Sequence, residues 1–504
     1  MGIPGFFRAI IRAHPSIVCV RSQVGQVNRC YVDFNAVCHP VCATHISTGD
    51  ESLMIRDVIQ HTRNLVRVAA PAERTYLATD GVPPLAKMQQ QRRRRFISVF
   101  VADQLGPANR GWDRSAISPG TTFMSKLSSA IKSDVKDESI ELWDDAEYGE
   151  GESKIFQHLR DAPPEPAQGA IVINGLDADL ICLALLSPAR RIFLMREPDN
   201  FRMDDTRTKS EEFLYLDIDT LRTDIERKGI DIASYVALCM FIGNDFLPAL
   251  GPLRIRRGGI DVLTRALTIV GRPLVTPTEP RSLDIDVLKA VLANVENVET
   301  KHMLDLHRWY QNASAPPSTA ADMMWEYFPI LAQNKNVMDI FGRGDWHANY
   351  RRLLFPGRET PREAAECYLE GLRWNLNYYI YGYRSVDVNR WHYPYAYGPL
   401  AADLMAAAMK VNTTPYVAPP GSREPFTPHE CLLLILPSAS AKLLPPTLLP
   451  IVTDPMRGCT HMYPTRFGFH TYLRNYMHEA IPQLPPFDTA SVLRQTRPIK
   501  KYGT

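Results

Sequence analysis

The sequence has no paired-cysteine motif and no long apolar run. Its nine cysteines are an odd number, are scattered and include no CxxC pair, so we expect reduced thiols in an intracellular protein rather than a disulfide framework. No apolar run reaches the roughly 18–20 residues of a membrane helix, and segments such as LICLALL (180–186) are typical of buried core. The opening MGIPGFFRAIIRAHP lacks the apolar stretch of a signal peptide. The secreted and membrane classes are therefore excluded.

An excess of charge of one sign is also missing. The 57 Lys and Arg residues face 55 Asp and Glu residues, which leaves a formal charge of +2. A near-neutral total usually argues against nucleic-acid binding, but here the charges are segregated. Residues 87–95 carry five positive charges, whereas residues 134–152 carry nine acids. We interpret the first part of the acidic block as a solvated loop.

The remaining composition is that of a folded protein, with 45% hydrophobic and 22% charged residues. Short β-rich runs alternate with helical patterns over the first 270 residues, which is typical of an α/β sheet. We predict strands at 30–34, 75–80, 170–175, 191–197 and 213–218, and helices at 52–70, 85–103 and 178–187. Prolines cluster later in the chain. We therefore expect a first domain over 1–270, a helical connector over 271–362, and a region rich in Tyr and Pro over 363–504 that packs on the first.

Acidic residues recur where the predicted strands end. Asp33 ends the first strand, Asp80 ends the second, and Asp177 and Asp179 follow the third. Ligands bind at the carboxyl ends of the strands in open α/β sheets, so we expect these four side chains to converge on one place. Taken singly, each is also compatible with a helix cap or a turn.

Three further acids join this set. Glu150 and Glu152 flank a glycine in YGEGES, where glycines let the backbone bend so that both carboxylates face one way, and Asp245 follows an apolar helix-like run. Clustered carboxylates repel one another unless cations neutralise them, and Asp and Glu favour Mg²⁺ or Mn²⁺ over Zn²⁺. Two such ions about 3.5–4 Å apart clamp the attacking and leaving oxygens of a phosphodiester. The pattern predicts metal-assisted phosphodiester hydrolysis.

A zinc site is the alternative metal centre. Cys38, His39, Cys42 and His45 offer four ligands within eight residues. Their spacing matches no standard zinc motif, no partner CxxC exists, and ligands so close in sequence close poorly around one ion. The spacing therefore argues against zinc.

The basic run lies directly after Asp80. On a helix, Lys87, Gln91, Arg94 and Arg95 share one face. Arginine grips phosphate with a planar fork and lysine adds a point charge. A solvated helix face or a localisation signal is the usual meaning of such a run, but its position beside a candidate metal ligand favours a phosphate pocket.

With these motifs in order, the chain resembles the Xrn/Rat family of 5′→3′ exoribonucleases. The first part carries MGIPGFFRAI (1–10), YVDFNAVCH (31–39), TDGVPPLAKMQQQRRRRF (79–96), ISPGTTFM (117–124), GEGESK (149–154), GLDADLICLAL (175–185) and FIGNDFLPAL (241–250). A second conserved region is matched by YGYRSVDVNRWHYPYAYGPLAADL (381–404) and PFTPHECLLLILPSAS (425–440). The resemblance covers most of 1–260 and 363–465.

The resemblance implies a PIN/FEN-like α/β nuclease core, in which a mostly parallel central sheet is flanked by helices and the second region packs against it. It implies processive removal of nucleotides from single-stranded RNA bearing a 5′ monophosphate, with two Mg²⁺ or Mn²⁺ ions. The implied catalytic and metal-binding residues are Asp33, Asp80, Glu150, Glu152, Asp177, Asp179 and Asp245. The implied 5′-phosphate pocket is formed by Lys87, Gln91, Arg94 and Arg95, and it leaves no room for a cap or a triphosphate.

Two aromatic positions complete the implied substrate site. His39 matches a family histidine that stacks on a terminal base, although a hydrogen-bonded core histidine is the alternative. The family motif with two tryptophans keeps only one here, Trp391, which we expect to stack on a base with a weaker grip on RNA.

The resemblance also sets wider expectations. We expect a short, divergent, core-only member that is monomeric, cytoplasmic rather than nuclear, and free of membrane contact. Its partners would be decapping or RNA-decay factors, or a larger particle. A structure-specific 5′ nuclease for DNA flaps and a catalytically silent RNA-binding scaffold remain the alternative functions.

Overall fold

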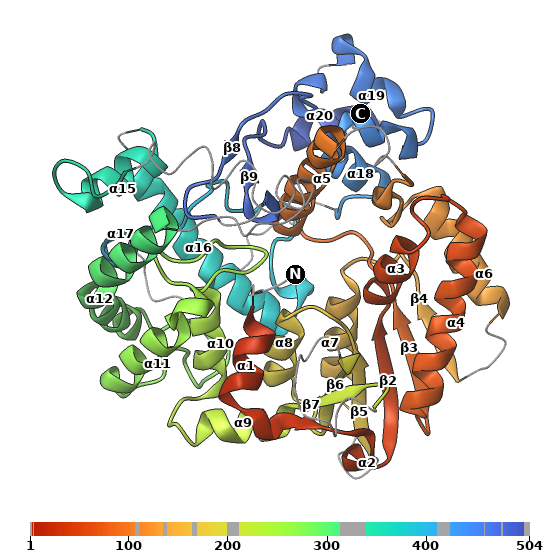
Figure 1. The fold of residues 1–504 in the computed structure, drawn as a ribbon, viewed down its shortest axis with the longest axis horizontal. Helices are drawn as coiled ribbons and strands as arrows, with labels where there is room; N and C mark the ends of the chain where they lie inside the picture. Colours follow the sequence, from red (N-terminus) through yellow and green to blue (C-terminus); the bar gives the residue numbers. More distant parts are fainter. Residues whose placement is uncertain are drawn as a thin grey trace, which may run out of the picture.

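A single large sheet organises the first half of the chain (Figure 1). The computed structural model describes residues 3, 5–105, 111–134, 139–163, 169–198, 211–312, 339–357, 359–410, 424–457, 459–474 and 477–497. Within these ranges seven strands pair in the order β1-β7-β6-β5-β2-β3-β4. The strands are β1 (Val18–Cys19), β2 (Val27–Asp33), β3 (Arg74–Ala78), β4 (Ile140–Trp143), β5 (Ala170–Asn174), β6 (Ile192–Arg196) and β7 (Leu214–Asp217).

The sheet is mixed but mostly parallel. Strands β6, β5, β2, β3 and β4 are parallel to one another, while β7 pairs antiparallel with both β6 and β1. The strand order reverses between β2 and β5, because β3 and β4 extend the sheet on one side of β2 and β5 and β6 on the other. Such a reversal leaves a crevice at the carboxyl ends of the strands. The fold therefore places its natural ligand site beside the end of β2.

Helices cover both faces of the sheet. Alternate residues of β2 point to opposite sides, so that Tyr31 joins one buried cluster and Val32 another. The first face is covered by α1 (Phe6–Ala13), α7 (Gly151–Asp161), α8 (Asp179–Leu186) and α9 (Ile218–Glu226). The second face is covered by α3 (Phe34–Ala43), α4 (Glu51–Ala69) and α6 (Thr122–Asp134). The predicted α/β fold with a mostly parallel sheet between helices is confirmed.

The predicted elements agree closely with the observed ones. The five predicted strands correspond to β2, β3, β5, β6 and β7, and the three predicted helices to α4, α5 (Leu85–Leu105) and α8. Residues 135–138 of the predicted solvated acidic loop lie outside the described residues, and the block continues as strand β4 rather than as a loop. The Trp143 ring packs 4.9 Å from that of Tyr76, and this contact secures an edge strand within an acidic stretch.

The second half of the chain is mainly helical. The helices described there are α10 (Ile232–Met240), α11 (Gly259–Val270), α12 (Ile285–Asn312), α15 (Trp346–Leu354), α16 (Thr360–Tyr381), α17 (Ala401–Ala408), α18 (Pro428–Ile435), α19 (Leu449–Thr453) and α20 (Thr489–Thr496). The first half also contains the short α2 (Arg21–Val24). A small hairpin joins β8 (Phe469–His470) and β9 (Ile481–Pro482). Figure 1 shows α16 crossing the centre of the molecule and α5 lying among the C-terminal elements, beside α18 and β9.

The two halves share one hydrophobic core. The cluster that contains Tyr31 extends from Ile3 through α8 and α10 to Trp374 on α16 and Ala408 on α17. The predicted connector falls on α12 and α15, while its residues 313–338 lie outside the described residues, as do 411–423 and 498–504 of the predicted second region. The domain boundaries stay a prediction. None of the helices described is both long and apolar enough to cross a membrane.

Candidate active site

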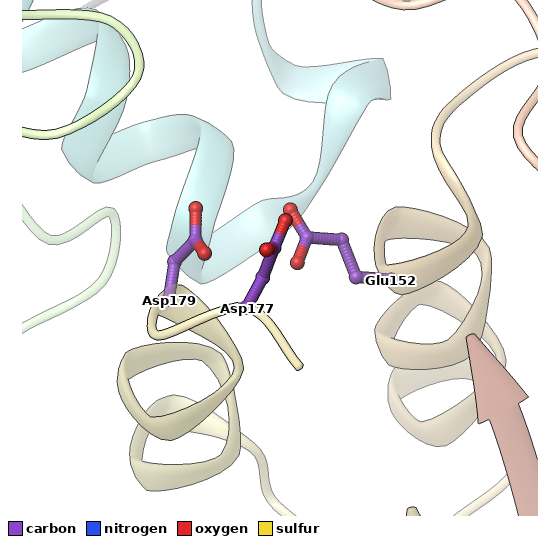
Figure 2. Close-up of side chains that lie close together, drawn as sticks. All are labelled: Glu152, Asp177 and Asp179. Carbon is purple, nitrogen blue, oxygen red and sulfur yellow. The ribbon is translucent and has the colours of Figure 1, made fainter. Parts of the chain in front are cut away.

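Carboxylates gather where the parallel strands end. Asp33 is the last residue of β2, Asp80 lies two residues after β3, and Asp177 follows β5. Figure 2 shows Glu152, Asp177 and Asp179 with their carboxylates turned toward one another. Their donor oxygens all lie within 4.8 Å of one another. Three acids that are distant in sequence are thus brought close enough to share one cation.

The remaining predicted acids belong to the same electrostatic site. Burial, followed by the charges of Asp80, Asp177 and Glu150, raises the pKa of Asp33 well above its ordinary value. Burial and then Asp245 raise the pKa of Asp179 to about 6. The structure therefore brings all seven predicted acids into one mutually repelling group, which we call the carboxylate cluster.

Lys87 provides a cation inside the carboxylate cluster. Its Nζ lies 2.7 Å from Oε1 of Glu150 and 2.8 Å from Oδ2 of Asp245, and the side chain is only 7% exposed. Although burial opposes it, Asp245 and Glu150 raise the pKa of Lys87 well above its ordinary value. In return, Lys87 holds the pKa of Asp245 below its ordinary range against the effect of burial. Burial still raises the pKa of Glu150 to about 7.

Two glycines position the start of α7. Gly149 has a φ of 98°, a left-handed conformation that a residue with a side chain rarely adopts. A Cβ at Gly151 would lie 2.5 Å from the carbonyl oxygen of Ala78, so the helix can approach the end of β3 only without one. The N–H of Gly151 donates to Oδ1 of Asp80 at 2.7 Å. This contact fixes Glu150 and Glu152 beside the strand-end carboxylates.

The helix-cap alternative does not hold for Asp33, and Glu150 does not act as a cap either. Asp33 and Glu150 occupy the N-cap positions of α3 and α7, but neither side chain accepts a capping hydrogen bond. Their carboxylates are thus not used to complete the helix ends.

The donor set fits a hard divalent cation. One carboxylate oxygen each of Glu150, Glu152 and Asp179 is buried without a hydrogen-bond partner among the described residues. Burying such an oxygen is costly unless a cation or a donor compensates it. A set made only of carboxylate oxygens suits Mg²⁺ or Mn²⁺ rather than Zn²⁺.

The zinc alternative is not supported. Cys38 and Cys42 are buried in the hydrophobic cluster behind the sheet, and Nε2 of His45 is paired with Oδ2 of Asp57 at 2.8 Å. Among the residues that the structure describes, the group able to hold a metal is Glu152, Asp177 and Asp179.

The predicted phosphate pocket lies along α5. Gln91 is buried and accepts a hydrogen bond of 3.3 Å from Nη1 of Arg95, whose Nη2 donates to Oγ of Ser118 at 2.6 Å. Arg94 is exposed. Arg92 points elsewhere, because it is buried and donates to the backbone oxygens of Pro485 and Met462. The basic run is therefore not a uniformly solvated face.

His39 lies beside this basic face on α3. Burial, followed by the charges of Arg94, Arg95 and Arg114, lowers its pKa to about 3. The imidazole is consequently neutral at physiological pH and half-buried. A neutral ring next to the arginines is compatible with base stacking, which stays a prediction.

Trp391 has a different environment from the one predicted. Its ring is only 6% exposed and stacks on Trp374 at 5.1 Å. Gly371 leaves room for it, since a Cβ there would lie 2.2 Å from the indole. This arrangement favours a packing role for Trp391 over the predicted contact with a base.

Three residues near the carboxylates were missed from the sequence. Arg196 ends β6 and donates from Nη2 to the backbone oxygen of Asp177 at 2.7 Å. Tyr379 of α16 lies 3.5 Å from Oδ2 of Asp179. Oδ1 of Asn35 accepts the backbone N–H of Asp80. The end of a predicted strand marks Arg196, whereas no local pattern marks Tyr379.

Comparisons with known proteins agree with this arrangement. The model of the XRN 5′-3′ exonuclease N-terminus matches residues 1–198, and the Xrn1 helical domain matches 222–322 and 356–503. The human 5′-3′ exoribonuclease 1 is 25% identical over 98% of this chain and 34% of its own length. The 5′-3′ exoribonuclease 2 of Gallus gallus is 24% identical over 97% of this chain and 69% of its own length.

A likeness to a solved structure is also found. The catalytic core of Rad2 in complex with a DNA substrate is 13% identical, with a TM-score of 0.34, over 64% of this chain and 86% of that chain. The chain spans about a third of the length of the human relative named above. Because the two family models together take in most of the described fold and the whole carboxylate cluster, the chain belongs to the XRN family of 5′-3′ exonucleases.

Proposed function

We propose that the chain is a metal-dependent 5′→3′ exoribonuclease that removes mononucleotides processively from single-stranded RNA with a 5′ monophosphate. The observation that carries the proposal is the course of α5, which begins inside the carboxylate cluster at Lys87 and continues as a basic face at Gln91, Arg94 and Arg95. At 1.5 Å per residue, Lys87 and Arg95 are about 12 Å apart along the helix axis. A 5′ phosphate held on this face has the next phosphodiester close to the carboxylates.

The carboxylate cluster suits hydrolysis without a protein nucleophile. Bound Mg²⁺ or Mn²⁺ ions, two in number, would supply hydroxide near neutral pH and neutralise charge on the phosphate. Glu152, Asp177 and Asp179 are the residues that would hold one ion. Lys87 pairs with Glu150 and Asp245, and its charge acts on Asp33 and Asp80. Lys87 offers its ammonium to the phosphate oxygens at the border between the two parts of the site.

The proposed hydrolysis leaves an RNA end that can be cleaved again. The oxygen of water adds to phosphorus, the bond from phosphorus to the 3′ oxygen of the first nucleotide breaks, and that oxygen takes a proton. The released nucleotide keeps its 5′ phosphate, and the shortened RNA has a new 5′ monophosphate. The basic face can therefore bind the product end as it bound the substrate end. A decapping reaction, or another reaction that leaves a 5′ monophosphate, would supply the first substrate.

A substrate panel tests the proposal. The full chain is incubated with RNA that carries a 5′ monophosphate, triphosphate, cap or hydroxyl, and with flap DNA, in Mg²⁺ and in EDTA. We expect mononucleotides from the monophosphorylated RNA alone, and only with the metal. Efficient cleavage of flap DNA would favour the structure-specific nuclease, and RNA binding without hydrolysis would favour a scaffold.

A further inference from the structure

Three arginines are linked to one segment of the second region, at residues 393–399, one of them directly and two through neighbouring residues. Arg474, between β8 and β9, donates from Nη2 to the backbone oxygen of Ala396 at 2.9 Å and lies 5.7 Å over the Tyr397 ring. Arg254 donates to the backbone oxygens of Gly251 and Leu253.

Arg254 and Arg93 are connected to the segment at residues 393–399 through neighbouring residues. The N–H of Gly251 donates to the oxygen of Pro399 at 3.0 Å, which ties the Arg254 loop to the segment. Arg93, on α5, reaches it through Gln89, whose amide bridges Arg93 Nη2 and the backbone oxygen of Tyr393 when its oxygen and nitrogen are assigned to suit both. We call Arg93, Arg254 and Arg474 the arginine trio; all three side chains are half-buried.

The charges of the trio act on one another. Burial, followed by the charge of Arg474, lowers the pKa of both Arg93 and Arg254 to about 10. Their field extends to His470, whose pKa is lowered by burial and then by Arg93 and Arg474. The trio is therefore one region of positive potential rather than three separate side chains.

Little in the chain compensates this charge. No member of the trio forms an ion pair with a carboxylate in the part of the chain that the structure describes. Glu479 favours the charged form of Arg254, but more distantly than an ion pair. Nε of Arg474 is buried and has no hydrogen-bond partner among the described residues. Each guanidinium has five N–H donors, and the hydrogen bonds named above use only some of them.

The need to hold residues 393–399 in place does not by itself explain why three arginines lie there. A single neutral glutamine donates to a backbone oxygen as well as an arginine does, without the repulsion of like charges that are partly removed from water. Arginine forks are instead the side chains best matched to phosphate oxygens. The cost of holding three of them together is offset when a phosphate group lies between them.

We propose that the arginine trio binds the phosphate group of a nucleotide at a second site, distinct from the predicted 5′-phosphate pocket. Arg93 lies two residues beyond Gln91 and therefore about 200° around α5, so the two sites occupy different faces of one helix. The phosphate belongs either to a nucleotide further along a bound RNA strand or to a free mononucleotide. The first source rests on the proposed exoribonuclease function; the second does not.

Binding measurements in EDTA test the trio without hydrolysis. Fluorescence anisotropy compares the wild-type chain, the double variant Arg254→Gln/Arg474→Gln, the charge-preserving Arg474→Lys, and Arg227→Gln. Arg227 is 73% exposed, and among the acids that the structure describes it pairs only with Asp224, so it controls for a general loss of charge. The probes are a 5′-monophosphorylated trinucleotide, a long single-stranded RNA, and AMP. Thermal melting of every variant shows that it is folded.

The outcomes identify the source of the phosphate. If the phosphate belongs to the RNA strand, the double variant should bind the long RNA roughly 10-fold or more weakly and bind the trinucleotide normally. The slope of log affinity for the long RNA against log salt concentration should also become shallower by about 0.7 for each phosphate contact removed. If it belongs to a mononucleotide, affinity for AMP should fall instead, and Arg474→Lys should retain part of either affinity. If the double variant binds every probe as Arg227→Gln does, the proposed phosphate site is overturned. If the wild-type protein binds AMP through the trio but binds no RNA, the result contradicts the proposed exoribonuclease function. The phosphate site at the trio would still be supported.

Discussion

Lys87 and Asp245 form a buried ion pair of 2.8 Å that joins α5 to the loop after α10. The same ammonium lies 2.7 Å from Glu150. The carboxylate cluster thus contains a cation of its own, supplied by the helix that also carries the predicted phosphate pocket. Metal ions and Lys87 would then neutralise the same group of acids.

Replacing Lys87 therefore tests how the carboxylate cluster is held together. In EDTA, Lys87→Met should lower the free energy of unfolding by about 3–5 kcal/mol, because it leaves two buried carboxylates without a partner. Mg²⁺ should restore more stability to this variant than to the wild type, as measured by urea denaturation. The exposed pair of Lys126 with Glu51, also 2.8 Å long, provides the control, and Lys126→Met should cost no more than about 1 kcal/mol. Equal losses would contradict a special role for Lys87.

Asp177 lies in the group of three carboxylates that could share one ion. Asp177→Ala should abolish mononucleotide release while the affinity for RNA, measured in EDTA, stays close to that of the wild type. The exposed Asp286→Ala, whose partner is Lys289 on the same helix, should retain full activity. An active Asp177→Ala variant would remove the carboxylate cluster from the reaction.

Arg94 is the exposed member of the predicted phosphate pocket. Arg94→Ala should erase the preference for 5′-monophosphate over 5′-hydroxyl RNA, because a charge-assisted contact to the terminal phosphate is lost. The ratio of kcat/KM for the two substrates is the measurement, with Arg227→Ala as the matched control. An unchanged ratio in Arg94→Ala would refute the pocket.

Stability should depend on pH in a definite direction when metal is absent. Burial raises the pKa of Glu150 from 4.5 to about 7 and that of Asp179 from 3.8 to about 6. The folded state therefore holds these protons more tightly than the unfolded chain does. Their contribution is complete below the ordinary values and is lost as the pH rises through 6 and 7.

Urea denaturation in EDTA measures this effect. The free energy of unfolding attributable to these groups should fall between about pH 4 and pH 7, and Mg²⁺ should reduce the decline because it replaces the protons. Glu150→Gln should flatten part of the profile. If the contribution of Glu150 and Asp179 to the stability of the metal-free protein instead increased as the pH rose, the assigned pKa directions would be contradicted.

Gly151 tests the placement of α7. Gly151→Ala puts a Cβ 2.5 Å from the Ala78 carbonyl oxygen and 3.2 Å from Oδ1 of Asp33, so the helix start must move away from the strand ends. We expect a folded protein with strongly reduced hydrolysis and weaker metal affinity, measured by melting with increasing Mg²⁺. Ser153→Ala, two residues later on the same helix, should have a much smaller effect. Full activity of Gly151→Ala would show that Glu150 and Glu152 need no close approach.

The sequence was sufficient where a local pattern has one structural meaning. Runs such as AIVI (170–173) are apolar throughout because parallel strands are buried on both faces, and this run lies in β5 as predicted. The acids at the strand ends follow from the same topology. Likewise, the helical spacing of Lys87 and Gln91 put both on one buried face of α5.

Other features depend on contacts that no local pattern records. Trp391 was interpreted from a motif, but its environment is set by Trp374 and Gly371 on α16. The edge strand β4 was hidden by the acids around it, since its stability comes from the contact between Trp143 and Tyr76. In the same way, the proximity of Arg93 and Arg474 depends on contacts between segments that are distant in the sequence.

The contact between Tyr379 and Asp179 makes α16 part of the wall of the carboxylate cluster. Because α16 also belongs to the core shared by both halves, occupation of the cluster and folding of the second half are thermodynamically linked. An ion that binds only the assembled site must stabilise α16, and loosening of α16 must weaken the ion's affinity by the same free energy. The C-terminal half is then a reporter of whether the site is filled.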